Sequence, residues 1–164
     1  VGSGWLEEEF DALGVSFDDR GDRTDEYLEA MRQAWSSDIA SYDGDFVSFS
    51  DVYSRPQPVN RHVPIVVGGH SKRAARRAGE LGDGFFPGRG NPQELSILFD
   101  HARMCAEKCG RDPEALEFTA GGPTTADYVE QLAEIGVTRM IVPPMAPAQF
   151  AEFGEEVIAQ FSAL

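Results

Sequence analysis

Short apolar runs alternate along the chain with segments whose apolar residues recur every three or four positions. The runs fall at residues 64–67, 84–86, 116–120 and 140–142 and predict short strands. The run at 64–67 is wholly apolar, which is typical of a strand buried on both faces of a parallel sheet. The segments between them have one apolar side each and predict amphipathic helices. The pattern therefore indicates a repeated strand–helix unit.

Helix boundaries are marked by capping residues. Thr24 followed by Asp25 predicts a helix from about 25 to 37. Asn91, Pro92 and Glu94 form a capping-box pattern that predicts the start of another helix. Further helices are expected at 71–81, from 124 or 125 to 135, and at the end of the chain, where apolar residues share one side; these are Phe150, Phe153, Val157 and Phe161.

The first third of the chain breaks the repeat. Residues 1–4 resemble the end of a strand, and Asp43-Gly44 between alternating residues predicts a β-hairpin. Arg55-Pro56-Gln57-Pro58 predicts an extended connector, so we assign a hairpin insertion to about residues 41–58. The whole chain, 1–164, is interpreted as a single domain.

Four strand–helix units imply an α/β fold with a parallel sheet. An open doubly wound sheet and a (β/α)₈ barrel both fit this order. A barrel typically needs about 250 residues, so the chain's 164 would supply only part of one. The first residue is Val1, and we expect the N-terminal strands to be missing. Exposed parallel edges invite pairing, which predicts a homo-oligomer formed by dimerisation or domain swapping.

Charge and composition exclude several classes of protein. The chain has 28 Asp and Glu residues but only 14 Lys and Arg residues, which gives a formal net charge of −14. This acidic balance argues against general nucleic-acid binding. No apolar stretch approaches the length of a membrane span, and no signal sequence opens the chain. Two cysteines, Cys105 and Cys109, are too few for a disulfide framework and indicate a cytoplasmic protein. Both lie on an apolar helix stripe, where we interpret them as core thiols.

The strongest candidate site follows the strand at 64–67. Gly68, Gly69, His70 and Ser71 connect this strand to a helix, and two glycines allow the backbone to approach a ligand closely. The free N–H groups at a helix start attract anions. Cations are disfavoured there without a counterion, yet Lys72, Arg73, Arg76 and Arg77 cluster in six positions. A bound phosphate would explain this cluster; a glycine turn leading into a solvated basic face is the alternative.

Other strand ends carry weaker signals. Residues 1–5 and Arg89 could face a ligand, although a plain turn and a loop arginine explain them as well. The glycine and proline pairs at 121–123 and 143–145 are interpreted as packing or turn residues. His62, His70 and His101 have no metal-ligand spacing, so no metal site is expected, and no nucleotide or hydrolase motif is present.

The ordered series of segments resembles the luciferase-like monooxygenases, which are flavin or deazaflavin (coenzyme F-420) oxidoreductases on a (β/α)₈ barrel. The resemblance rests on the stretch from Gly2 to Gly14, a helix at 20–28, the hairpin, and the segments 64–78 and 82–87. It covers nearly the whole chain as the C-terminal part of the barrel, from about the end of strand 4 to helix 8. The F-420-dependent branch is the most similar.

The resemblance implies hydride transfer between coenzyme F-420 and a small organic substrate. It implies that the cofactor phosphate lies between Ser3, Gly4 and Trp5 on one side and the backbone of Gly68, Gly69, His70 and Ser71 on the other, with added charge from Lys72 or Arg73. The resemblance also implies an arginine at the place of Ser3 in flavin-using relatives, so the serine favours F-420 over FMN. No catalytic residue is assigned. A non-catalytic barrel fragment that binds or assembles, an FMN-dependent monooxygenase and a phosphosugar-type barrel enzyme remain alternatives.

Overall fold

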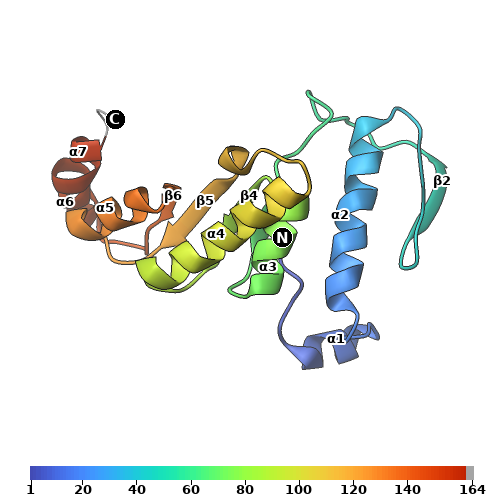
Figure 1. Ribbon diagram of the computed structural model, residues 1–164, viewed down its shortest axis with the longest axis horizontal. Coiled ribbons are helices and arrows are strands. Elements are labelled where there is room, and N and C mark those ends of the chain that lie inside the picture. Colours follow the sequence, from blue (N-terminus) through green and yellow to red (C-terminus); the bar gives the residue numbers. More distant parts are fainter. Residues whose placement is uncertain (162–164) are drawn as a thin grey trace. The chain divides into compact units, whose positions relative to one another are not determined.

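The computed structural model describes residues 1–161, which divide into two compact units, residues 1–65 and 66–161. Each unit is described by itself, and the expectation of a single domain stays a prediction. The first unit contains α1 (Glu7–Leu13), α2 (Arg20–Ser36) and the antiparallel hairpin of β1 (Ala40–Asp43) and β2 (Ser48–Val52). These elements can be followed in Figure 1. The hairpin confirms the turn predicted at Asp43-Gly44, because the N–H of Gly44 donates to the carbonyl of Val47.

Helix α2 begins five residues before the start predicted from Thr24. Thr24 is not its cap: it lies inside the helix, and its hydroxyl donates to the Arg20 carbonyl at 2.6 Å. The additional first turn is held by side chains, since Arg23 pairs with Asp19 and Arg20 donates to the Phe17 carbonyl. Capping signals from the sequence therefore placed the helix one turn too late, whereas the family resemblance had already placed a helix from Arg20.

The strand end expected at residues 1–4 is not formed, because residues 1–6 have no regular secondary structure. Gly4 has a φ of 78°, a left-handed conformation that interrupts an extended strand. The short helix α1, which the sequence pattern did not predict, follows this segment and begins with three glutamates that favour a helix N-terminus.

The second unit is built on a four-stranded parallel sheet in the order β3-β4-β5-β6. Its strands are β3 (Val66–Gly68), β4 (Gly84–Phe86), β5 (Glu117–Gly121) and β6 (Val137–Ile141). Its helices are α3 (Lys72–Leu81), α4 (Pro92–Lys108), the 3₁₀ turn η1 (Pro113–Ala115), α5 (Ala126–Glu134), α6 (Pro147–Phe153), the π-helical η2 (Gly154–Ile158) and α7 (Ala159–Phe161). Consecutive parallel neighbours are the order of adjacent strands in a (β/α)₈ barrel. The α/β fold predicted from the alternating pattern is confirmed.

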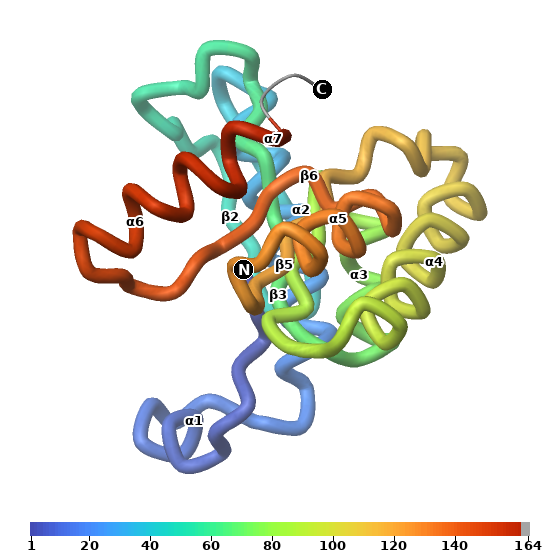
Figure 2. The backbone as a smooth tube through the Cα atoms, turned by 90° about the vertical axis from the view of Figure 1, so that its left-hand side faces the viewer, coloured from blue at the N-terminus to red at the C-terminus, as the bar shows by residue number. Residues whose placement is uncertain are grey.

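Helices α3 and α4 lie side by side against the sheet, as Figure 2 shows. Val67, Phe85 and Phe118 occupy matching register positions and bury their side chains on the face that α4 covers with Phe99. The Phe99 ring lies 4.3 Å from that of Phe118, measured between centroids. Burial of these aromatic side chains holds α4 on the strands, whereas α3 buries Ala74, Ala75 and Ala78.

Boundary shifts and one burial error remain. Strand β3 starts at Val66 rather than at residue 64, since Pro64 lacks the N–H that a ladder needs. Strand β6 starts at Val137, three residues before the predicted start at residue 140. The capping box at Asn91 is confirmed, with Glu94 closing it. Cys105 is buried as expected, but Cys109 is exposed because it lies at the C-cap of α4, beyond the packed part of the stripe. On the final helical stretch only Val157 is fully buried.

Candidate active site

The connection between β3 and α3 forms a cradle of backbone N–H groups, made of residues Gly68 to Arg73. Gly69 has a φ of 130°, which favours glycine, and a Cβ at this position would lie 2.9 Å from the Cβ of Ala74. Its N–H donates to the Phe86 carbonyl at 3.2 Å. Ser71 caps α3 by accepting from the N–H of Ala74 at 3.2 Å. Within residues 1–161, the N–H groups of Lys72 and Arg73 have no acceptor and remain available to an anion.

The cations predicted to surround this cradle separate into two groups. Lys72 and Arg73 are exposed in the first turn of α3, which contains no acidic residue. Arg76 instead forms an ion pair with Glu80 one turn further along, and Arg77 is buried with 6% of its surface exposed. A bound phosphate is therefore needed to explain only Lys72 and Arg73, while the other two have places in the folded helix.

Two loops that follow neighbouring strands meet beside the cradle. Nδ1 of His70 lies 3.1 Å from the carbonyl oxygen of Pro87, in the loop after β4. Pro87 is buried, and Arg89 lies exposed two residues later in the same loop. The family resemblance implied only a backbone role for His70. The contact through its side chain joins residues 17 positions apart, so no local sequence signal predicts it.

The other predicted cofactor residues belong to the first unit. Ser3 is half-buried, whereas Gly4 is exposed and Trp5 has 82% of its surface exposed. Gly4 lies against the Phe10 ring of α1, so one function of this glycine is local packing. Whether Ser3, Gly4 and Trp5 share a site with the cradle stays a prediction.

The remaining strand ends fit their interpretation as structural turns. Gly122 follows β5, and a side chain there would overlap the ring of Tyr128 in α5.

On the sheet itself, Arg139 of β6 donates to the Glu117 carboxylate of β5 at 2.7 Å. This cross-strand pair was not predicted, because its two residues are far apart in sequence and neither belongs to a motif.

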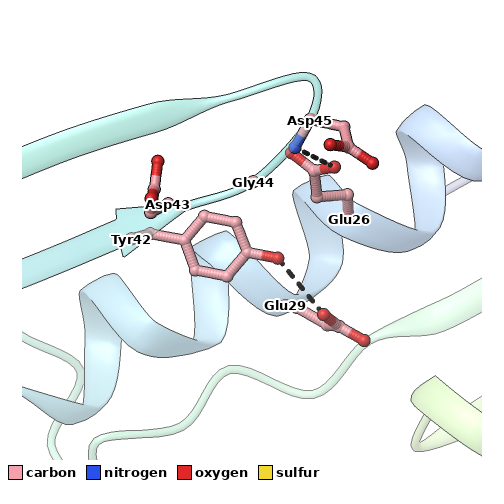
Figure 3. A pocket seen from close by; sticks show the side chains of 6 residues that line it. All are labelled: Glu26, Glu29, Tyr42, Asp43, Gly44 and Asp45. Atoms are coloured by element: carbon pink, nitrogen blue, oxygen red, sulfur yellow. Dashed lines mark hydrogen bonds between the residues drawn. The ribbon is translucent and has the colours of Figure 1, made fainter.

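An acidic pocket of about 490 Å³ lies in the first unit between α2 and the hairpin, as Figure 3 shows. Its lining residues are Glu26, Glu29, Tyr42, Asp43, Gly44 and Asp45. The Glu26 carboxylate accepts hydrogen bonds from the backbone N–H groups of three hairpin residues, at 3.0 Å from Asp45 and 2.8 Å from both Phe46 and Val47. The pocket's central carboxylate therefore anchors the hairpin turn.

Electrostatic shifts in this pocket follow from the same contacts. Partial burial opposes ionisation of Glu26, but the hairpin N–H groups and the nearby Arg23 outweigh it and lower the pKa of Glu26. Burial raises the pKa of Tyr42, and its hydrogen bond to Glu29 at 3.2 Å adds to the increase. Within residues 1–161, no group of three His, Cys, Asp or Glu side chains is placed to hold a metal ion.

The parallel sheet and its helices define an α/β fold of the (β/α)₈ type, with a glycine turn and two exposed first-turn cations at the end of β3. A family model described as luciferase-like monooxygenase matches residues 1–161, and the chain therefore belongs to the luciferase-like monooxygenase family. This confirms the family inferred from the ordered segments. No helix among the described residues is long and apolar enough to cross a membrane.

Two curated relatives illustrate the match. The chain is 34% identical over 143 residues to an uncharacterised protein of Mycobacterium tuberculosis, covering 87% of this chain and 49% of that protein. It is 30% identical over 161 residues to the FMNH₂-dependent dimethylsulfone monooxygenase of Pseudomonas putida, covering 96% of this chain and 43% of that enzyme. The chain thus spans about half the length of these curated relatives.

Among solved structures, the coenzyme F420-dependent tetrahydromethanopterin reductase from Methanopyrus kandleri superimposes with a TM-score of 0.78 at 15% identity. The alignment covers 98% of this chain and 73% of that one. The likeness shows the fold, which is that of the barrel enzymes in this family, and confirms the expected partial barrel.

Proposed function

We propose that the protein is an oxidoreductase that uses coenzyme F-420 to transfer a hydride to or from a small organic substrate. The observation that carries this proposal is the cradle at the end of β3. Its first-turn N–H groups, its glycine backbone and the exposed cations Lys72 and Arg73 suit the phosphate of such a cofactor.

The chemistry of the cradle residues fits the phosphate of this cofactor. At Gly69 a φ of 130° and the nearby Ala74 leave no room for a side chain, and the positive end of the α3 dipole lies beside this turn without an acidic residue to neutralise it. The bound cofactor would supply the hydride chemistry, while the N–H groups of Lys72 and Arg73, next to the turn of Gly68, Gly69 and Ser71, would hold its phosphate. Ser3, Gly4 and Trp5 are proposed as the second wall of the same site. No residue of the chain is proposed as catalytic.

An FMN-dependent monooxygenase is the second candidate. It is favoured by the 30% identity to the FMNH₂-dependent enzyme of Pseudomonas putida, which extends over 96% of this chain. FMN also carries a phosphate, so the cradle itself would serve either cofactor.

Titration of the protein in its full natural length with F-420 and with FMN separately tests the proposal. We expect F-420 to bind more tightly, and the K72A/R73A double variant to weaken that binding by more than about tenfold, since one charge-assisted hydrogen bond contributes about 1.5–3 kcal/mol and about 1.4 kcal/mol is tenfold in affinity. Lys108, exposed in the last turn of α4, offers the matched control K108A, which should leave binding unchanged. Tighter binding of FMN would favour the second candidate. Binding of neither cofactor would refute both and favour a non-catalytic module.

The proposed partners are a small substrate and a second copy of the chain. Strands β3 and β6 form the edges of the four-stranded sheet, and unpaired parallel edges favour association. A cytoplasmic location remains a proposal that rests on the free thiols of Cys105 and Cys109.

A further inference from the structure

The side chain of His70 makes a contact that the proposed phosphate site does not use. Its Nδ1 lies 3.1 Å from the Pro87 carbonyl oxygen. A carbonyl oxygen only accepts hydrogen bonds, so Nδ1 must carry the proton in this contact. The neutral ring is therefore the Nδ1–H tautomer, and Nε2, on the far side of the ring from Pro87, carries the lone pair.

This hydrogen bond belongs to a double link between two strand-end loops. Next to it, the N–H of Gly69 donates to the carbonyl of Phe86 at 3.2 Å. The two bonds join consecutive residues of the loop after β3 to the last residue of β4 and to the first residue of the loop that follows it. Pro87 is buried and so provides a fixed anchor, whereas His70 is exposed and reaches it only through its ring.

Arg89 lies two residues beyond this anchor. It is exposed, and within residues 1–161 no ion pair or hydrogen bond occupies its guanidinium. Any restraint on Pro87 limits the positions that Arg89 can reach, because only Gly88 separates them. The cradle already contains two exposed cations, Lys72 and Arg73, and a third from the neighbouring loop would add to their attraction for an anion.

We propose that His70 is a positioning residue: through its Nδ1–H bond to Pro87, it holds the loop after β4 so that Arg89 serves the phosphate bound at the cradle. The inference rests on the proposed function, because the phosphate is that of the proposed cofactor. In this proposal Arg89 contacts the phosphate, and the His70 ring acts only through Pro87 on the position of Arg89.

The tautomer tests the structural half of the proposal without any cofactor. In ¹⁵N NMR spectra of the protein, the His70 ring should show a protonated Nδ1 and an unprotonated Nε2 at a pH where the ring is neutral. A His70 signal of the opposite tautomer would overturn the proposal, because the bond to Pro87 would then not exist in solution.

Binding measurements test the functional half, with F-420 as the probe, or FMN if that is the cofactor bound. The amide nitrogen of asparagine is attached to Cγ as Nδ1 is, and that of glutamine lies one atom further out, as Nε2 does. We expect H70N to bind the cofactor within about twofold of wild type, and H70A and H70Q to bind about fivefold more weakly, the effect of one lost hydrogen bond. Full binding by H70Q together with weak binding by H70N would overturn the proposal.

A double-mutant cycle tests the route through Arg89. If His70 acts by holding this arginine, H70A should cost little affinity in an R89A background, whereas independent contacts would give additive losses. Additive losses would refute the positioning role while leaving the proposed function intact. If the wild-type protein binds neither cofactor, the proposed function itself fails, and this inference fails with it.

Discussion

Gly79 lies where α3 packs closely against the backbone of α4. A Cβ at this position would overlap the carbonyl oxygen of Ala102, and would lie 2.9 Å from both the nitrogen of Ala106 and the Cβ of Cys105. Two of these three neighbours are backbone atoms of α4, which cannot turn aside as a side-chain end could. Gly79→Ala must therefore push the two helices apart.

The magnitude follows from two opposing effects. Inside a helix, alanine is preferred to glycine by about 1 kcal/mol. Overpacking a tight contact costs about 1–3 kcal/mol, and overlap with backbone atoms places Gly79 at the upper end of that range. We expect a net loss of about 2 kcal/mol, which lowers the melting temperature of a chain of this size by roughly 4–8 °C.

Thermal unfolding followed by circular dichroism measures this effect. Gly154→Ala is the matched control, because Gly154 has helical backbone angles and nothing within 4 Å of an added Cβ. That variant should melt at or slightly above the wild-type temperature. If Gly79→Ala also melts at or above wild type, the close approach of α3 and α4 is wrong.

Three further predictions concern the hairpin, α4 and the sheet edges. Because the pKa of Glu26 is lowered from 4.5, its stabilisation of the hairpin is complete above that pH and is lost as the pH falls through the lower, folded-state value. Hairpin NMR signals should therefore show an acid transition that Glu26→Gln removes; an unchanged transition in that variant would contradict the assignment. Asn91→Ala removes the capping box of α4 and should cost about 1 kcal/mol by denaturant unfolding, whereas an unaltered midpoint would mean that the cap contributes nothing. The open edges at β3 and β6 should make the isolated 164-residue chain a dimer or larger in light scattering, and a monodisperse monomer would refute the pairing.

Sequence reasoning succeeded where a signal lies within one turn or one strand. The run at 84–86 became β4 without any shift, and the capping box at Asn91 formed as its spacing predicted. It failed where a distant or three-dimensional partner decides the boundary. Helix α2 starts at Arg20 rather than after Thr24, because side chains around Asp19 and Phe17 hold an extra turn.

The candidate site shows the same division. The glycines and cations at 68–73 are adjacent in sequence, so their pattern alone predicted an anion cradle at a helix start. The structure then separated the four cations, since Arg76 pairs with Glu80 and Arg77 is buried. It also added Pro87, whose carbonyl has no sequence signature.

The sequence by itself determined the order of strands and helices from the hairpin onward, the capping of α4 and the glycine turn before α3, because periodicity, caps and glycine turns act between residues a few positions apart. Only the tertiary structure decided that His70 bonds to Pro87, 17 residues away, and that Gly79 lies against α4. Such contacts depend on how the helices dock on the parallel sheet, which no local pattern specifies.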